Sequence, residues 1–377
     1  MLASCAKAET GESTASAETS TAAPFKVSDV ATYEEPWAIA FAPGTGVLFV
    51  TEKSGKLKFI DTANGTQGTV SGAPKVDYGG QGGLGDVAFL PAESSATVGG
   101  RTIYLSWAEA GDGDTRGAVV GRGKLVCAEA TACAIEDLTV IWRQTPKVSG
   151  RGHYSHRIAF SPDGKYLFVA SGERQKMQPA QDTAMTLGKI VRLNLDGTPA
   201  AGNPLAAQAG VAGGGVSADI WSMGHRNILG MDWDAQGRLW EVEHGPAGGD
   251  ELNLVKAGAN YGWPVRSNGD HYNGDPIPDH APGDGFAQPA ASWNPVIAPS
   301  DMLIYSGAMF PAWKGHALMT GLATQAVIDV AIEGESAREV ARHEFDNRLR
   351  AVAQGPDGSV WVAEDGKGAR LFKLTAR

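Results

Sequence analysis

Four groups of polar residues interrupt the apolar pattern of the chain, each directly before an expected strand. They are Gln81, then His153, His156 and Arg157, then His225, Arg226 and Asn227, and finally Arg348 and Arg350. Arginine presents a planar fork that pairs with carboxylates and stacks on flat rings. A neutral histidine among cations has a lowered pKa and can act as a base near neutral pH. Brought together, these groups would suit a planar, polyanionic ligand with a base beside it.

Each group also has a structural interpretation when it is taken alone. A histidine at a junction of loop and strand is more often a hydrogen-bonded structural residue than a base. Arg348 and Arg350 point to one face at period 2 and could simply form salt bridges, and Asn227 could satisfy a turn. A binding or catalytic role is favoured over these structural roles only if the fold makes the four groups converge.

The segment EVEHGPAGGDELNLVKAGANYGWP, residues 241–264, has features of an ion site. His244-Gly245-Pro246 ends an expected strand in a sharp turn, and a residue before proline is held extended. Adjacent carbonyls can then face one side, and backbone carbonyls are Ca²⁺ ligands. Gly245 and Pro246 are therefore candidate ligands for one ion.

The same segment offers a second candidate ion site. Asp250 and Glu251 with Tyr261 could hold a structural Ca²⁺ through oxygen ligands. The alternative for the whole segment is an ordinary surface hairpin.

A repeated unit supplies the elements that would position these groups. Copies begin at four places: AIAFAPGTGVLFVTEKSGKLKFID at Ala38, RIAFSPDGKYLFVASGE at Arg157, LGMDWDAQGRLWEVEHG at Leu229 and RAVAQGPDGSVWVAEDG at Arg350. Each reads as a short apolar strand, a tight turn with glycine and a second strand. Two weaker copies are DVAFLPAESSATVGGRTIYLSWAEA and MLIYSGAMFPAWKGHALMTGLATQAVIDVAI.

Six such units predict an all-β chain folded as a six-bladed β-propeller. The four polar groups precede the first strand of a blade, and equivalent loops lie at the same end of a propeller. We therefore expect the groups to converge at one mouth of the central channel. A pair of β-sandwiches is the structural alternative, but it would not explain the recurring turn.

Composition excludes some classes of protein. The 377 residues carry a net charge of −10, which argues against nucleic-acid binding, because that requires Lys and Arg to neutralise phosphates. No apolar run approaches the ~20 residues of a transmembrane helix.

The N-terminal residues 1–24 have tether composition, rich in Ser, Thr, Ala and Glu, and precede the propeller domain at 25–377. Leu2-Ala3-Ser4-Cys5 fits the pattern before a lipid-modified cysteine in bacterial lipoproteins, although no apolar signal region precedes it. We expect a periplasmic or cell-envelope protein attached to the membrane through lipidated Cys5. The alternative is a disordered leader with a chance cysteine.

The two remaining cysteines, Cys127 and Cys133, are six residues apart. This spacing can close a small disulfide loop, in keeping with an oxidising compartment. Two unpaired thiols are the alternative.

Several segments, in order, resemble one known family. GQGGLGDVAF, RGHYSHRIAFSPDG, GKIVRLNLDG, GHRNILGMDW, EHGPAGGDELNLVKAGANYGWP and NRLRAVAQGPDG are similar to the soluble aldose sugar dehydrogenases that depend on pyrroloquinoline quinone (PQQ), relatives of soluble quinoprotein glucose dehydrogenase. The resemblance covers about residues 33–377. It implies a six-bladed propeller with PQQ across the channel mouth, a Ca²⁺ on PQQ, and oxidation of aldoses at C1 to lactones.

The resemblance also implies roles for individual residues. Gln81 would contact PQQ, and His153 would be the general base that takes the C1 hydroxyl proton. Arg226 and Asn227 would bind PQQ near its reactive quinone, with Arg226 stabilising negative charge on the reduced cofactor.

The resemblance also implies which residues neutralise the PQQ carboxylates and which bind Ca²⁺. Arg348 and Arg350 would pair with PQQ carboxylates. The carbonyls of Gly245 and Pro246 would bind the Ca²⁺ on PQQ, which polarises a quinone carbonyl as a Lewis acid.

The resemblance assigns Glu251 and Tyr261 to a second Ca²⁺. Glu173 lies about where the family has an acidic partner for the arginine of GHRN, here Arg226. One departure concerns a PQQ-binding lysine in a GALK-like segment, because this chain has GLATQ with Thr324 at the lysine position. This substitution bears on the affinity for PQQ.

Two other functions remain as alternatives. A non-catalytic propeller would bind a glycan or a protein through the same mouth, and Thr324 is its best support. A metal-dependent lyase or lactonase would need more carboxylates at the mouth than this sequence places there.

Overall fold

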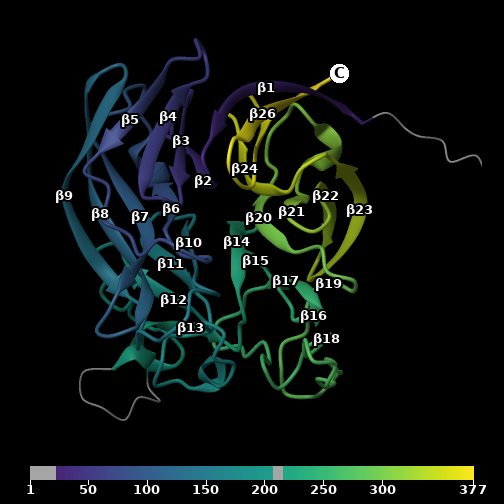
Figure 1. Cartoon of the computed structure of the whole chain (residues 1–377). Coiled ribbons are helices and arrows are strands. Elements are labelled where there is room, and N and C mark those ends of the chain that lie inside the picture. Colours follow the sequence, from purple (N-terminus) through teal and green to yellow (C-terminus); the bar gives the residue numbers. More distant parts are fainter. Residues whose placement is uncertain (1–22, 207–214) are drawn as a thin grey trace, which may run out of the picture.

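The computed structural model describes residues 23–206 and 215–377, and this part of the chain is all-β. Six blades of four antiparallel strands surround a central axis (Figure 1), which confirms the predicted six-bladed propeller. The helical pieces among the described residues are short 3₁₀ turns: η1 (Pro91–Glu93), η2 (Gln178–Gln181), η4 (Val216–Asp219) and η5 (Pro311–Trp313).

The first three blades follow one another along the chain. Blade 1 comprises β2 (Pro36–Phe41), β3 (Val47–Glu52), β4 (Lys56–Asp61) and β5 (Gln67–Ser71). Blade 2 comprises β6 (Leu84–Phe89), β7 (Arg101–Ala110), β8 (Arg116–Glu129) and β9 (Ala132–Arg143). Blade 3 comprises β10 (Ser155–Phe160), β11 (Tyr166–Ser171), β12 (Lys189–Asn194) and β13 (Ile220–Met223). Blades 1 and 2 also join at their outer edges, because β5 and β9 pair in parallel.

The last three blades use both ends of the chain. Blade 4 comprises β14 (Ile228–Trp233), β15 (Leu239–Glu243), β17 (Asp250–Leu254) and β19 (Ala291–Trp293). Blade 5 comprises β20 (Pro299–Ile304), β21 (Ala317–Gly321), β22 (Ala326–Glu333) and β23 (Ser336–Glu344). Blade 6 comprises β24 (Leu349–Gln354), β25 (Val360–Glu364), β26 (Ala369–Ala376) and β1 (Phe25–Tyr33). A separate two-stranded pair, β16 (Ala247–Gly248) with β18 (Gly269–Asp270), lies beside blade 4.

The ring closes through the two ends of the chain. β1 pairs antiparallel with β26, from Phe25 opposite Ala376 to Tyr33 opposite Ala369, as Figure 1 shows. The innermost strands then contact one another in a circle: β2, β6, β10, β14, β20, β24 and again β2. The first strand of the fold therefore completes the last blade.

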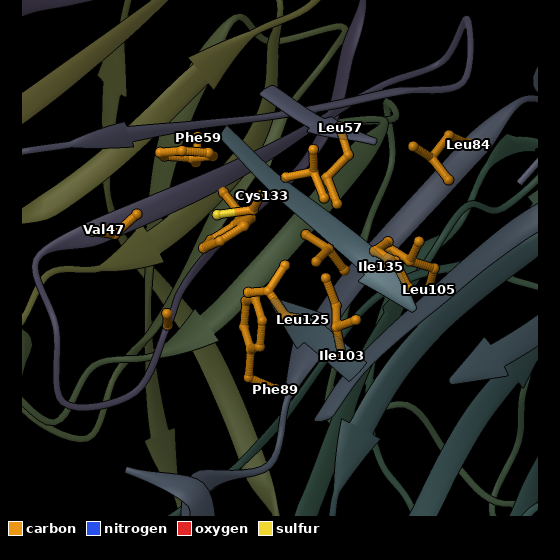
Figure 2. Packing of buried hydrophobic residues seen from close by; sticks show 14 of the residues in the cluster. Val47, Leu57, Phe59, Leu84, Phe89, Ile103, Leu105, Leu125, Cys133 and Ile135 are labelled. Carbon is orange, nitrogen blue, oxygen red and sulfur yellow. The ribbon is translucent and has the colours of Figure 1, made fainter. Parts of the chain in front are cut away.

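Burial patterns explain why the strands take these places. All six side chains of β3, VLFVTE, are buried, as expected for a strand with blades on both faces, whereas β23, SAREVARHE, alternates exposed and half-buried residues at the rim. The core lies between blades, and Figure 2 shows Phe59 of blade 1 and Phe89 of blade 2 in one cluster. Each such buried side chain stabilises the fold by about 1.5–3 kcal/mol.

Aspartates, two of them buried and one half-buried, tie neighbouring blades together near the axis. Asp86, Asp232 and Asp301 occupy innermost strands, and each accepts the N–H of a residue in the innermost strand of the next blade. The acceptor-to-donor distances are 2.8 Å to Ile158, 2.7 Å to Ile304 and 3.0 Å to Val352. Burial raises the pKa of Asp232 to about 6.

The predicted disulfide is present. Cys127 and Cys133 are bonded and join β8 to β9. The predicted lipidation residue, Cys5, lies outside the described residues. Within 23–206 and 215–377, no helix is long and apolar enough to cross a membrane.

We expect Asp232→Ala to destabilise the protein by about 1–3 kcal/mol, because the buried N–H of Ile304 loses its acceptor. Asp232→Asn, which keeps a carbonyl oxygen at this place, should lose less. Urea unfolding followed by tryptophan fluorescence measures both. Equal stability of Asp232→Ala and the wild type would show that these contacts between blades do not stabilise the ring.

Candidate active site

The loops that precede the innermost strands border a cavity of about 370 Å³ at one mouth of the channel. Four of the predicted site residues line it: Gln81, Asn227, Arg348 and Arg350. Gln81 belongs to blade 2, Asn227 to blade 4 and both arginines to blade 6; His156 of blade 3 also lines the cavity, so groups from four blades meet there. His153 and Arg226 do not line this cavity. Each directly precedes in sequence a residue that does, Tyr154 and Asn227.

His153 is buried and held at two points. Its N–H donates to Gln81 Oε1 at 2.6 Å, and its Nδ1 is hydrogen-bonded to a carboxylate oxygen of Glu173. Burial lowers the pKa of His153, and the nearby charge of Arg226 lowers it further, while Glu173 opposes both effects; the net pKa lies below the ordinary value. The imidazole is therefore neutral at neutral pH, with Nε2 left as a proton acceptor.

Glu173 follows β11, and its position depends on the loop that it caps. Its Oε2 accepts the N–H groups of Lys176 and Met177, both at 2.5 Å. Burial alone would raise the pKa of Glu173, but the hydrogen bond with His153 and that from Met177 outweigh it, and the net pKa is lowered. The resemblance suggested that Glu173 pairs with Arg226, whereas its side-chain partner in the structure is His153.

Backbone strain is concentrated around this pair. Ten non-glycine residues of the described chain have positive φ, and six of them lie in two segments of blade 3, one around the start of β10 with His153 and one after β11 with Glu173. These six are His153 (φ 47°), Ser155 (56°), His156 (53°), Arg174 (61°), Gln175 (57°) and Met177 (60°). Such conformations cost free energy and persist where surrounding contacts impose them, which is common at functional sites.

Arg226 and Asn227 are fixed by a carboxylate from the neighbouring strand. Glu243 Oε2 accepts the N–H of Arg226 at 2.5 Å and that of Asn227 at 3.2 Å. The Arg226 guanidinium donates to the His244 carbonyl at 3.0 Å and lies 5.1 Å from the Trp263 ring. Its Nε is buried without a hydrogen-bond partner among the described residues.

Of the histidines that the sequence placed before strands, His225 lies away from the open mouth, whereas His156 lines the cavity although its side chain is buried. His225 is fully buried, hydrogen-bonded with Ser222 at 2.9 Å and stacked on Tyr261 at 4.6 Å. His156 stacks on Trp37 at 4.8 Å, and burial lowers its pKa to about 3. Successive side chains of an extended segment point to opposite sides, which is why the neighbours of Arg226 do not all face the cavity.

Arg157 was also expected at the mouth, but the structure places its side chain among the innermost strands. Its guanidinium contacts Asp86 at 3.4 Å and Asp301 at 3.2 Å and stacks over Trp37 at 4.2 Å. It therefore supports the inner ring of strands.

His244 is one of several cavity residues that the sequence did not single out as site residues. His244 was read only as the end of a strand, yet it lines the cavity and its Nε2 contacts the Pro299 carbonyl at 2.6 Å. Burial lowers its pKa to about 3. Its place directly before Gly-Pro was the available signal.

Arg348 and Arg350 share one acid. Arg348 Nε lies 3.0 Å from Asp365, and Arg350 NH2 lies 2.7 Å from the same carboxylate. All three side chains line the cavity. The two arginines thus form the expected salt bridges and still leave a net positive charge at the mouth.

The turn at Gly245 and Pro246 is held by Asp250. Asp250 Oδ1 accepts the Gly245 N–H at 2.8 Å, and Oδ2 accepts those of Ile297 at 2.8 Å and Ala298 at 2.7 Å. That Asp250 is a ligand of a structural ion stays a prediction, and the role that these three bonds give its carboxylate is structural. Its role is to fix the turn that carries the two candidate carbonyls.

A second, much smaller cavity lies beside the first, with His244 common to both. Arg226, Gly245, Glu251 and Tyr261 are among its lining residues. The Tyr261 hydroxyl donates to the Leu254 carbonyl at 2.5 Å, which leaves the carbonyl of Tyr261 as its candidate ligand atom.

Behind this cavity, the paired strands β15 and β17 bury several carboxylates. Glu241 lies opposite Asn253, and Glu243 lies opposite Glu251. Ligand atoms of His225, Glu241 and Glu243 lie within 4.8 Å of one another. Burial, followed by the charge of Glu243, raises the pKa of Glu241 to about 8. Glu241 is therefore mainly protonated at neutral pH, and a cation bound nearby would favour its ionised form.

The lysine of the resembling family has no equivalent at Thr324. Thr324 lies in a loop whose Leu322 lines the cavity, and its hydroxyl contacts the Ile297 carbonyl at 3.4 Å. A different cation, Lys53, lines the cavity instead and donates to the Gly80 carbonyl at 3.0 Å.

Comparison with known proteins identifies the family. The model of the family described as glucose/sorbosone dehydrogenase matches residues 33–373. The chain belongs to this family. Aldose sugar dehydrogenase YliI of Escherichia coli is 36% identical over 351 residues, which cover 91% of each chain.

Solved structures agree with this assignment. The apo-form of the soluble aldose sugar dehydrogenase Asd from Escherichia coli has a TM-score of 0.85 and 35% identity, covering 94% of this chain and 100% of that one. The PQQ-bound form of aldose sugar dehydrogenase from Streptomyces coelicolor has a TM-score of 0.73 and 27% identity, covering 94% and 99%.

We expect Glu173→Gln to lower the pKa of His153 further, because the hydrogen bond and charge of Glu173 oppose the effect of burial. Titration of the imidazole resonances by NMR measures this in the protein without cofactor. Glu344→Gln, on the rim strand β23, is the control and should leave the pKa unchanged. An unchanged or higher pKa in Glu173→Gln would show that the pair does not govern the proton affinity of His153.

Proposed function

We propose that this protein is a PQQ- and Ca²⁺-dependent aldose dehydrogenase that oxidises the C1 hydroxyl of a sugar to the lactone. One observation carries the proposal: the neutral His153, oriented by Glu173, stands beside a cavity rich in arginine. Membership of the glucose/sorbosone dehydrogenase family supports the substrate class.

The donor set fits PQQ, a planar cofactor with several carboxylates. Arg348 and Arg350 offer guanidinium forks at the cavity wall, and Gln81 and Asn227 offer amides. The buried, unpartnered Nε of Arg226 is a donor without an acceptor, which a cofactor oxygen would satisfy. When bound, PQQ supplies a quinone that accepts the hydride from C1.

Residues of the protein accept the proton of the C1 hydroxyl and stabilise the charges that develop during the reaction. His153 Nε2 takes the proton of the C1 hydroxyl, since Nδ1 is engaged by Glu173. Glu173, ionised because its pKa is lowered, stabilises the imidazolium that forms. Arg226, immobilised by Glu243 and His244, would stabilise negative charge on the reduced cofactor.

We assign the two predicted ions to adjacent places. The carbonyls of Gly245 and Pro246 would bind the Ca²⁺ that contacts PQQ, in a turn fixed by Asp250. Glu251 and the carbonyl of Tyr261 would hold a second ion at the smaller cavity, next to the cluster of buried carboxylates. Lys53 would supply the cation that Thr324 lacks.

We further propose a periplasmic location, with membrane attachment through lipidated Cys5. The second candidate function, a non-catalytic propeller that binds a glycan or a protein, is favoured by Thr324 alone. Reduction of an artificial electron acceptor by the protein with PQQ, Ca²⁺ and an aldose separates the two. The absence of dye reduction across a panel of aldoses, with PQQ shown to be bound, would refute the proposal that the protein is an aldose dehydrogenase.

His153→Ala should lower kcat by about 10²–10⁴-fold while PQQ still binds, as expected for loss of a general base. The dye-reduction assay and a PQQ titration measure the two effects. His316→Ala, which removes a histidine paired with Asp329, is the control and should keep full activity. Turnover of His153→Ala within a few-fold of the wild type would assign the base elsewhere.

Glu251→Gln should weaken the stabilisation of the protein by Ca²⁺ and leave PQQ binding largely intact. Thermal unfolding with Ca²⁺ and with a chelator measures the first effect, because a ligand of the folded state raises the melting temperature. Loss of PQQ binding with unchanged stability would mean that the two ions are assigned the wrong way round.

A further inference from the structure

The most exposed of the large hydrophobic side chains in the described structure belongs to Tyr272. Its exposed fraction is 77%, against 42–47% for the other five of this kind. A single exposed aromatic residue is ordinary on a protein surface. Tyr272 is tied to a candidate site residue: its hydroxyl accepts a hydrogen bond from Arg226 NH2 at 3.1 Å.

The loop that carries Tyr272 is tied to the turn of the candidate metal site. β18 ends at Asp270, just before His271 and Tyr272, and pairs with β16, where Ala247 and Gly248 follow Pro246. The tip is closed by two bonds, from the His271 N–H to the Asp275 carbonyl and from the Gly274 N–H to the His271 carbonyl, each at 2.9 Å. The position of Tyr272 is therefore set by the same turn that carries the carbonyls of Gly245 and Pro246.

Two aromatic rings flank the Arg226 guanidinium. The Trp263 ring lies 5.1 Å away and the Tyr272 ring 5.8 Å away, distances at which a cation and a ring attract each other. Arg226 is only 4% exposed. Trp263 is buried, so Tyr272 is the flanking ring that remains open to solvent, next to the cation of the proposed reaction centre.

We propose that Tyr272 is a specificity-determining residue, whose hydroxyl positions Arg226 and whose open ring forms a wall of the aldose site. This rests on the proposed function. A sugar ring presents one face of C–H groups and a rim of hydroxyls, which suits an apolar aromatic face with a polar edge. The substrate expected from this wall is an aldose in its pyranose form.

Two substitutions separate the hydroxyl from the ring. Tyr272→Phe keeps the ring and removes the acceptor of Arg226, and Tyr272→Ala removes both. Tyr166→Phe is the matched control, because Tyr166 also lies against an arginine, at 4.7 Å from Arg192, but at the start of β11 and away from the mouth. We measure kcat and KM for the aldose by dye reduction. We also measure binding of 1,5-anhydroglucitol, which has no C1 hydroxyl, to the PQQ-loaded protein by calorimetry.

Tyr272→Phe should lower kcat about 3–10-fold and leave KM within about twofold, because an interaction with the charge-stabilising arginine is lost. Tyr272→Ala should raise KM about tenfold or more and weaken binding of the anhydro sugar to the same degree. Tyr166→Phe should match the wild type in each measurement.

Wild-type values of KM and of sugar affinity in both Tyr272 variants would overturn the proposal. So would an equal loss of sugar affinity in Tyr272→Phe and Tyr272→Ala, because the ring would then have no role of its own. Failure of the proposed function is a different result: the wild type itself would reduce no dye with PQQ and Ca²⁺.

Discussion

The pairing of β1 with β26 is the constraint on which the rest of the structure depends. It joins the two ends of the chain in one blade and closes the circle of innermost strands. The mouth has no framework of its own, because each of its polar groups belongs to a different blade. Aspartates such as Asp301, which accept the N–H of the next blade, hold these blades in register near the axis. The cavity therefore exists only while the ring is closed.

Buried carboxylates then fix the loops that the sheets leave free. Glu173 orients His153, Glu243 holds the backbone of Arg226 and Asn227, and Asp250 holds the turn at Gly245. Each acid accepts backbone N–H groups that would otherwise be buried without partners. The mouth presents the cations Lys53, Arg348 and Arg350 with fewer carboxylates, Glu35 and Asp365, while the anions Glu173, Glu243 and Asp250 fix the loops around it. This arrangement lets a polyanionic cofactor and a neutral base occupy neighbouring places.

The sequence predicted the fold because its signal is local and repeated. Strand, tight turn and strand recur often enough to indicate blades, and the loops before the blades indicated the mouth. The side of a loop that a residue faces is not local information, so His225 was placed at the mouth although it is buried beside Tyr261. The structural role of Asp250 could not be predicted because its backbone partners, at Ile297 and Ala298, lie far along the chain. Tyr272 lies in a loop without periodicity, and only its contact with Arg226 distinguishes it.

The central claim is that the mouth is built for PQQ with a Ca²⁺ held by backbone carbonyls. Calorimetric titration of the protein with PQQ, in the presence of Ca²⁺ and again with a chelator, tests it most directly. We predict one binding site per chain in the presence of Ca²⁺ and a large loss of affinity when the ion is removed. No binding of PQQ with Ca²⁺ present, or binding that is indifferent to the ion, would contradict the account.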